Sequence, residues 1–230
     1  MDTRHDTAAF DAALPAGDDG WMPRRADGDD LAKMTFDRVV AALALVMLAP
    51  VLLAIAAWIA LRDQGPVLFA HPRIGKNGRM FRCLKFRTMA VDADAILSRH
   101  LAESPAAAAE WRATQKLRDD PRVTRLGRFL RRTSLDELPQ LFNILRGEMS
   151  LVGPRPIVEA EVHHYGAAIF DYMSVRPGLT GLWQVSGRSD VGYTERVRMD
   201  QRYVRDCTLR NDLRILWRTV GVVLRREGSY

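Results

Sequence analysis

The stretch Arg131-Arg132-Thr133-Ser134-Leu135-Asp136-Glu137-Leu138-Pro139-Gln140 places two adjacent carboxylates directly before an apolar helical pattern. That pattern has the spacing of one helix face and consists of Leu138, Leu141, Phe142 and Leu145. Two helix starts fit it. Ser134 and Glu137 have the spacing of a capping box, whereas Asp136 as N-cap keeps Pro139 within the first turn. On either choice both carboxylates lie at a helix N-terminus, where the helix dipole keeps them ionised and attracts phosphates.

The acidic pair lies in a strongly basic setting. A Gly-Pro-Arg-Pro segment, Gly153–Pro156, follows it, and five arginines precede it: Arg122, Arg125, Arg128, Arg131 and Arg132. One interpretation is that the pair only starts a helix. The arginines favour a second interpretation, a carboxylate nucleophile that reacts with a phosphate, because cations offset the repulsion between two negative groups.

Length and charge set the broad class of the protein. A chain of 230 residues holds one domain, alone or with accessory segments. Residues 1–30 contain eight Asp and three Arg, a net charge of −5. Because the whole chain has a formal net charge of +6, the remaining residues carry a net charge of +11. A basic body predicts an anionic partner, such as a nucleotide, a lipid headgroup or a nucleic acid. Cys83 and Cys207 have no motif spacing, which fits a reduced, cytosolic environment without a disulfide framework or a zinc site.

The N-terminal part divides into a tail and an apolar segment. Residues 1–32 are rich in Asp, Ala, Gly and Pro and predict a disordered tail. Their negative charge and the late start of the apolar segment exclude a secretory signal. Val39–Leu61 is a run of 23 uncharged residues, long enough to cross a bilayer. A buried helix of a soluble protein is the alternative.

The charges on both sides of this segment and a proline within it indicate its membrane topology. Basic residues lie on both sides of it: Lys33 and Arg38 before, and Arg62, Arg73 and Lys76 after. The positive-inside tendency keeps both ends in the cytoplasm. Pro50 lacks an N–H and can bend the helix back. We therefore expect a re-entrant helix, although a spanning helix with a proline kink fits the composition too.

The next segments predict a hairpin and three helical regions. Asn77-Gly78 separates two extended stretches, Val67–Ile74 and Met80–Met89, which is typical of a β-hairpin. Lys85 and Arg87 flank an aromatic residue near its end and fit either a solvated strand face or a phosphate site. Helices are expected over 91–117, with a break at Pro105, over 119–132, and more weakly over 157–173. The second of these is basic and amphipathic, which suits a membrane surface or phosphate ligands equally.

The C-terminal part combines a loop with two helices. Arg176–Arg188 is rich in glycine, polar and aromatic residues and predicts a binding loop, without any standard nucleotide motif. Helices are expected over 193–206 and 209–224. The last one carries Leu213 and Trp217 on an apolar face and arginines on the opposite face. This pattern fits an interfacial helix and a core-packed helix equally.

Five motifs in order resemble a known family. They are Pro66–Phe69, Lys85–Met89, the run from Asp120 to Gln140, Met149–Pro156 and Arg176–Gly181. Together they resemble the bacterial sugar transferases, the monotopic polyprenyl-phosphate phosphoglycosyl transferases that initiate exopolysaccharide, capsule and glycan assembly. The resemblance covers residues 33–224 and is closest to the short, exopolysaccharide-initiating form, which lacks an extra N-terminal transmembrane bundle.

The resemblance implies a reaction and residue roles. A UDP-sugar gives its phospho-sugar to undecaprenyl phosphate at the cytoplasmic face of the bacterial inner membrane, UMP leaves, and Mg²⁺ is required. Asp136 matches the nucleophile that forms a covalent phospho-sugar intermediate, and Glu137 matches the residue that helps to hold Mg²⁺. The implied substrate- or phosphate-binding residues are Lys85, Arg87, Arg155, Arg176, Arg188 and Asp200. The family's helix break is usually Ser-Pro, whereas this chain has Ala49-Pro50 and lacks the hydroxyl.

The sequence therefore predicts a mainly helical α+β protein in three parts. These are an acidic tail over 1–32, a re-entrant membrane helix over 33–62, and a cytosolic catalytic domain over 63–230 with a small β-hairpin and interfacial helices. Expected partners are the UDP-sugar, undecaprenyl phosphate, membrane lipid and downstream glycosyltransferases, and a homo-oligomer is compatible with the sequence. The alternative is a basic membrane-surface scaffold without catalysis. Nucleic acid is not expected, because no binding motif accompanies the charge.

Overall fold

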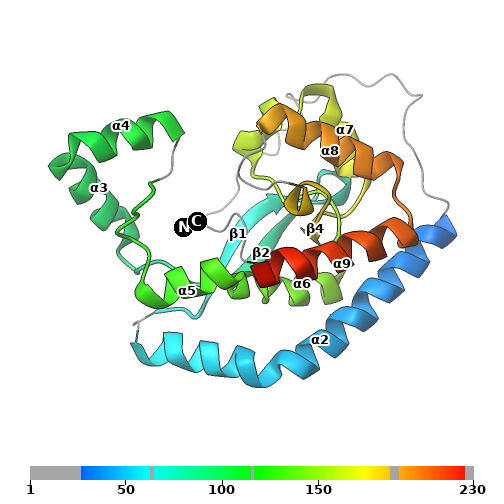
Figure 1. Cartoon of the computed structure of the whole chain (residues 1–230), viewed down its shortest axis with the longest axis horizontal. Coiled ribbons are helices and arrows are strands. Elements are labelled where there is room, and N and C mark those ends of the chain that lie inside the picture. The colour runs from blue at the N-terminus through cyan, green and yellow to red at the C-terminus, as the bar shows by residue number, and fades with distance from the viewer. Residues whose placement is uncertain (1–26, 63–64, 115–116, 187–191, 226–230) are drawn as a thin grey trace.

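The computed structural model describes residues 27–62, 65–114, 117–186 and 192–225. Its first element, α2 (Asp27–Arg62), is one helix of 36 residues that runs along the lower edge of the molecule in Figure 1. Ala and Leu dominate its sequence, and both favour a helix. Because α2 begins at Asp27, residues 27–32 belong to the helix and not to the predicted tail. The rest of that tail, residues 1–26, lies outside the described residues.

The helix α2 changes direction along its length, as Figure 1 shows. Pro50 lies inside it, and the backbone remains helical on both sides. A proline inside a helix removes one backbone hydrogen bond and commonly bends the helix, so the predicted effect of Pro50 agrees with the observed shape. Whether the helix re-enters or spans the membrane stays a prediction.

Most of the apolar surface of α2 is exposed. Among the described residues, the segment Asp30–Arg62 is long and apolar enough to cross a membrane, and a stretch of 18 residues within it has a mean hydropathy of 2.9. Ala41, Ile55 and Ile59 are buried against the rest of the protein. The large apolar side chains that are exposed include Val39, Leu43, Val46, Met47, Val51, Leu53, Trp58 and Leu61. The core helix of a soluble protein does not fit this exposure, because exposed apolar surface of this extent marks contact with a membrane or a partner.

The predicted hairpin is confirmed. Strands β1 (Leu68–Ile74) and β2 (Met80–Phe86) pair antiparallel, from Leu68 opposite Phe86 to Ile74 opposite Met80. They are joined through the short turn η1 (Lys76–Gly78), where Asn77 and Gly78 have φ values of 58° and 71°. Asn and Gly tolerate this left-handed conformation better than other residues, so they fix the turn and the register.

Helices α3 (Ala93–Glu103) and α4 (Pro105–Thr114) form a pair that extends away from the rest of the protein, at the left of Figure 1. The predicted break at Pro105 is confirmed, because this proline is the first residue of α4. Helix α5 (Arg125–Thr133) begins later than expected. The Thr124 hydroxyl caps it by accepting a hydrogen bond from the Gly127 N–H. Helix α6 is Gln140–Arg146.

A second small sheet was not predicted. Strands β3 (Ser150–Val152) and β4 (Gly178–Thr180) pair in parallel, the latter within the predicted binding loop. A Cβ at Gly178 would lie 2.1 Å from the Gly153 nitrogen, so this close backbone approach requires glycine. The connection between the strands contains η3 (Glu159–His164), η4 (Gly166–Ala168) and α7 (Ile169–Ser174), and η5 (Trp183–Val185) follows β4.

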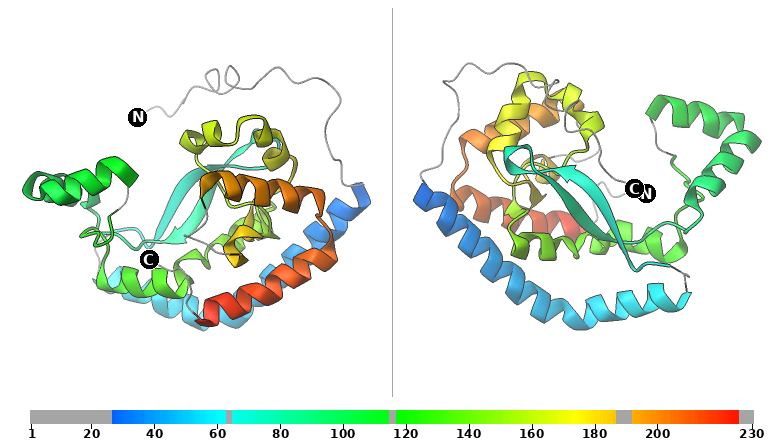
Figure 2. Two further views of the ribbon diagram at one scale, coloured as in Figure 1. Left: turned by 45° about the horizontal axis from the view of Figure 1, so that its top comes forward. Right: turned by 180° about the vertical axis from the view of Figure 1, so that it is seen from behind.

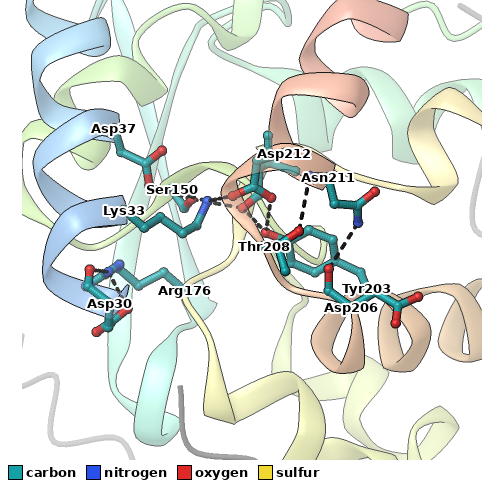
Figure 3. A network of polar contacts seen from close by, with 11 residues as sticks. Asp30, Lys33, Asp37, Ser150, Arg176, Tyr203, Asp206, Thr208, Asn211 and Asp212 are labelled. Atoms are coloured by element: carbon teal, nitrogen blue, oxygen red, sulfur yellow. Dashed lines mark hydrogen bonds and ion pairs between the residues drawn. The ribbon is translucent and has the colours of Figure 1, made fainter. Parts of the chain in front are cut away.

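Helices α8 (Tyr193–Arg205) and α9 (Leu209–Arg225) complete the fold and match the expected ranges. A buried polar network connects both of them to the first part of α2 (Figure 3). Lys33 Nζ lies 2.6 Å from Asp212 Oδ2 on α9, and the Asp37 carboxylate accepts a 2.7 Å hydrogen bond from the Ser150 hydroxyl. The Tyr203 hydroxyl on α8 donates to Asp212 at 2.8 Å. This network fixes α2 to the rest of the protein despite its exposed apolar surface.

Candidate active site

The acidic pair lies in a single 3₁₀ turn, η2 (Leu135–Glu137), between α5 and α6. Ser134 ends α5 in the left-handed conformation, with φ 57°, and its side chain caps neither neighbouring helix. Pro139 is the N-cap of α6. Both predicted helix starts are therefore wrong: the capping box does not form, and Asp136 is not the N-cap. The left-handed conformation of Ser134 turns the chain sharply, so η2, which carries the two carboxylates, does not continue the direction of α5.

Asp136 is largely enclosed, with 8% of its surface exposed. Burial, and secondarily the charge of Glu137, raise the pKa of the Asp136 carboxyl from 3.8 to about 6, while Lys85 and Arg131 oppose the rise. The pKa of Asp136 is therefore higher than that of an exposed carboxyl at a helix terminus, because desolvation outweighs the nearby cations. At neutral pH the carboxylate is nevertheless mostly ionised.

Glu137 pairs with a strand residue far away in sequence. Lys85 Nζ, near the end of β2, lies 2.6 Å from Glu137 Oε1, and both side chains are about a quarter to a third exposed. The hairpin thus brings Lys85 to the acidic pair. The interpretation of Lys85 as a residue of a purely solvated strand face does not fit this contact, and its role at a phosphate stays a prediction.

The five preceding arginines have different surroundings. Arg131 donates through Nε to the Thr88 hydroxyl at 2.9 Å and is electrostatically coupled to Asp136, while burial lowers the pKa of its guanidinium. Arg122 instead forms a 2.6 Å ion pair with Asp120. The other three, Arg125, Arg128 and Arg132, are exposed. Arg131 is therefore a member of the site that the sequence pattern did not distinguish from its neighbours, because only burial separates them.

Two further predicted cations lie at different depths. Arg87 follows β2 directly and is buried, with its guanidinium against Gly65. Arg155 follows β3 and lies 5.8 Å from the centre of the Trp183 ring, within the range of a cation–π contact. Arg155 also acts electrostatically on Cys83 of β2, where it lowers the pKa of the thiol and so opposes the rise caused by burial.

Of three other predicted site residues, two have partners away from the acidic pair and the third is not described. Arg176 donates to Asp30 at 2.7 Å and so supports the start of α2 (Figure 3). Asp200 is buried on α8 and accepts a 2.8 Å hydrogen bond from the Tyr165 hydroxyl. Arg188 lies outside the described residues. Substrate contacts for these three stay predictions.

The site borders the buried side of α2. Ile55 and Ile59 pack with Phe86 and Leu130 in one apolar cluster. Phe86 is adjacent in sequence to Lys85, and Leu130 is adjacent to Arg131. The cations that surround Asp136 are therefore carried by the same backbone segments that pack against the apolar helix.

The donor set suits a weakly held Mg²⁺. Within the described residues, no group of three or more His, Cys, Asp or Glu side chains could hold a metal ion. Mg²⁺ commonly binds to one or two protein carboxylates, with substrate phosphates and water as its remaining ligands. The partly exposed Glu137 carboxylate fits that requirement.

Comparison with known proteins agrees with this geometry. A family model described as "Bacterial sugar transferase" matches residues 28–226. The chain is 50% identical over 200 residues to the exopolysaccharide production protein ExoY of Sinorhizobium fredii, covering 87% of this chain and 88% of that protein. It is 50% identical over 199 residues to the undecaprenyl-phosphate galactose phosphotransferase of Salmonella typhimurium, covering 86% of this chain and 41% of that protein. It is 51% identical over 198 residues to the UDP-galactose-lipid carrier transferase of Erwinia amylovora, covering 86% of this chain and 41% of that protein. The chain thus spans about two fifths of the length of several of these relatives.

Proposed function

The chain belongs to the bacterial sugar transferase family, and we propose that it transfers a hexose 1-phosphate from a UDP-sugar to undecaprenyl phosphate. The products are UMP and undecaprenyl-diphosphate-hexose, which is the first membrane step of exopolysaccharide synthesis. The observation that carries this proposal is the enclosed Asp136 beside Glu137, with Lys85 and Arg131 around the pair.

We propose that Asp136 acts as a nucleophile in two steps. Its carboxylate oxygen attacks the sugar-proximal phosphorus of the UDP-sugar, and the bond from that phosphorus to the bridging oxygen breaks, so that UMP leaves. An oxygen of undecaprenyl phosphate then attacks the same phosphorus and regenerates the free carboxylate. Lys85 and Arg131 reduce the repulsion between Asp136 and the diphosphate.

We propose that Glu137 would help to hold Mg²⁺ together with the substrate phosphates. When bound, the ion would neutralise charge on the diphosphate and on the leaving group. The Lys85 ammonium holds one Glu137 oxygen and fixes the direction of that carboxylate. Arg155 is proposed to contact phosphate oxygens of the substrate, since its guanidinium is a cation that suits phosphate.

The proposed location is the cytoplasmic face of the bacterial inner membrane, with α2 re-entrant. Support comes from the two ends of α2. The first part is fixed to α9 through Lys33 and Asp212, and the last part packs through Ile55 and Ile59 on the cluster that contains Leu130. Because both parts contact the same body, a spanning helix would have to lose one of these contacts.

The donor is proposed to be a UDP-hexose, with galactose first, because two of the similar proteins are named for galactose. The test is UMP release by the purified protein in detergent, given undecaprenyl phosphate, Mg²⁺ and a panel of UDP-sugars. Release that depends on the lipid, with one preferred sugar, is expected for the natural sequence and for the control Asp94→Asn on α3. Asp136→Asn should abolish it. Absence of release with every donor, from protein shown to be folded, would favour the scaffold alternative.

A further inference from the structure

A second cationic surface lies between α8 and α9, which run one above the other in Figure 1 and in the left view of Figure 2. The two helices line a groove of about 730 Å³. Among the described residues its lining contains six arginines, three from each helix: Arg198, Arg202, Arg205, Arg210, Arg214 and Arg218. The residues around Asp136 are not part of this lining, so the proposed phosphotransfer does not account for the groove.

Few carboxylates balance these arginines. Glu195 and Asp206 also line the groove, and each pairs with one arginine at the surface: Arg198 to Glu195 at 3.2 Å, and Arg202 to Asp206 at 3.8 Å. For the other four arginines, no ion pair occurs within the described part of the chain. The described lining therefore carries an excess positive charge of four, and the groove favours an anionic ligand.

Helix α9 places this charge beside an apolar stripe. Leu213, Trp217 and Val220 on α9 are 50%, 81% and 56% exposed. Arg214 directly follows Leu213, and Arg218 directly follows Trp217. Successive residues of an α-helix are rotated by about 100°, so these arginines lie to one side of the apolar stripe. If the apolar stripe enters the lipid, the arginine stripe lies to its side, at the height of the headgroups. The buried Asp212 and Ile215 face the protein and fix this orientation of the helix.

We infer that the groove between α8 and α9 binds the phosphate headgroups of anionic phospholipids. This inference rests on the membrane association in the proposed function, but not on its chemistry. Arginine suits phosphate because its planar guanidinium donates two parallel hydrogen bonds to it. A basic cluster on an amphipathic helix at the membrane is typical of anionic-lipid recognition, and the adjoining apolar stripe favours a lipid over a free phosphate.

Binding can be measured by native mass spectrometry of the full chain in detergent, with phosphatidylglycerol or phosphatidylcholine of identical acyl chains. Phosphatidylglycerol should bind in preference. The triple variant R210Q/R214Q/R218Q should bind it at least tenfold more weakly, since each arginine near an anionic surface contributes roughly fivefold. The control R99Q/R112Q/R118Q removes three arginines from the α3–α4 region and should retain the preference. The variant R210K/R214K/R218K, which keeps the charge, should retain most of it even if the glutamine variant folds poorly.

Three outcomes would overturn the inference. One is equal binding of both lipids. Another is displacement of phosphatidylglycerol by an equal concentration of glycerol 3-phosphate, which would indicate a pocket for small phosphates. The third is a preference for phosphatidylglycerol that is absent in the unchanged chain and present in the variant D2N/D6N/D11N/D18N/D19N. That result would mean that acidic residues of the chain itself occupy the groove. Asp136→Asn should bind phosphatidylglycerol normally, so failure of the lipid site and failure of the proposed catalysis are distinguishable.

Discussion

At the residue scale, the enclosure of Asp136 has a measurable consequence for catalysis. Its pKa is about 6, raised from 3.8 by burial and by Glu137. A carboxylate nucleophile must be ionised, so kcat/KM for the UDP-sugar should fall about tenfold per pH unit below pH ~6 and stay level above it. Mg²⁺ bound at the pair would move this limb to lower pH. A pH–rate profile at several Mg²⁺ concentrations tests both statements. A limb that moves to higher pH as Mg²⁺ is added would contradict them.

Two adjacent arginines provide a matched comparison at the same scale. Arg131 is half-buried and donates to Thr88 near Asp136, whereas Arg132 is exposed. Arg131→Gln should lower kcat/KM by roughly 10- to 100-fold, because the site loses a partly desolvated cation that offsets the charge of the incoming diphosphate. Arg132→Gln should change it by less than about threefold. Equal losses in both variants would mean that the cations act only through the net charge of the surface.

The sequence predicted which residue types gather at this site, but not their physical state. Asp136, Glu137 and Lys85 could be identified from the resemblance and from the basic setting of the acidic pair. The left-handed Ser134, the raised pKa of Asp136 and the difference between Arg131 and Arg132 could not, because each depends on burial by segments distant in the chain.

At the element scale, the polar network that holds α2 should matter for stability. Lys33, Asp212 and Asp37 are all buried. Lys33→Met would leave two buried carboxylates without their cation, which should lower the free energy of unfolding by about 3–5 kcal/mol. The control is Lys76→Met: Lys76 pairs with Asp30 at 2.9 Å, but both side chains are 32% exposed, so its loss should cost below about 1 kcal/mol. Thermal unfolding in detergent compares them, and equal melting temperatures would contradict the role assigned to Lys33.

Local signals predicted some elements and not others. Asn77-Gly78 fixed the β1–β2 hairpin, Pro105 divided α3 from α4, and an apolar face located α9. Strands β3 and β4 have only three residues each and pair across a long connection. Three residues carry no period, so only the tertiary contact at Gly153 and Gly178 defines these strands.

At the scale of the whole molecule, the contacts of α2 with the body predict its topology. Single cysteines at Thr35 and Arg62, in a chain with Cys83→Ala and Cys207→Ser, should both react with a membrane-impermeant maleimide in inside-out vesicles. Neither should react in intact spheroplasts. Both positions are exposed at opposite parts of α2, so the labelling reports the membrane side and not burial. Labelling of Arg62→Cys only from the outside would establish a spanning helix and contradict the re-entrant proposal.

The position of the arginines in the fold also belongs to the scale of the whole molecule. The positive charge predicted an anionic partner, and the structure places Arg131 near Asp136 and six other arginines along the groove between α8 and α9. Composition could not predict this division, because it follows from how α9 presents its arginines beside its apolar stripe.

The central claim is that Asp136 carries the phospho-sugar, and the most direct test omits the lipid acceptor. Purified protein with Mg²⁺ and the preferred UDP-sugar should release close to one UMP per chain. Intact-mass measurement should show a gain equal to one hexose phosphate, located at Asp136 by peptide mapping and absent in Asp136→Asn. UMP release that requires undecaprenyl phosphate, with no change in protein mass under any condition, would contradict the account and indicate direct transfer between the two substrates.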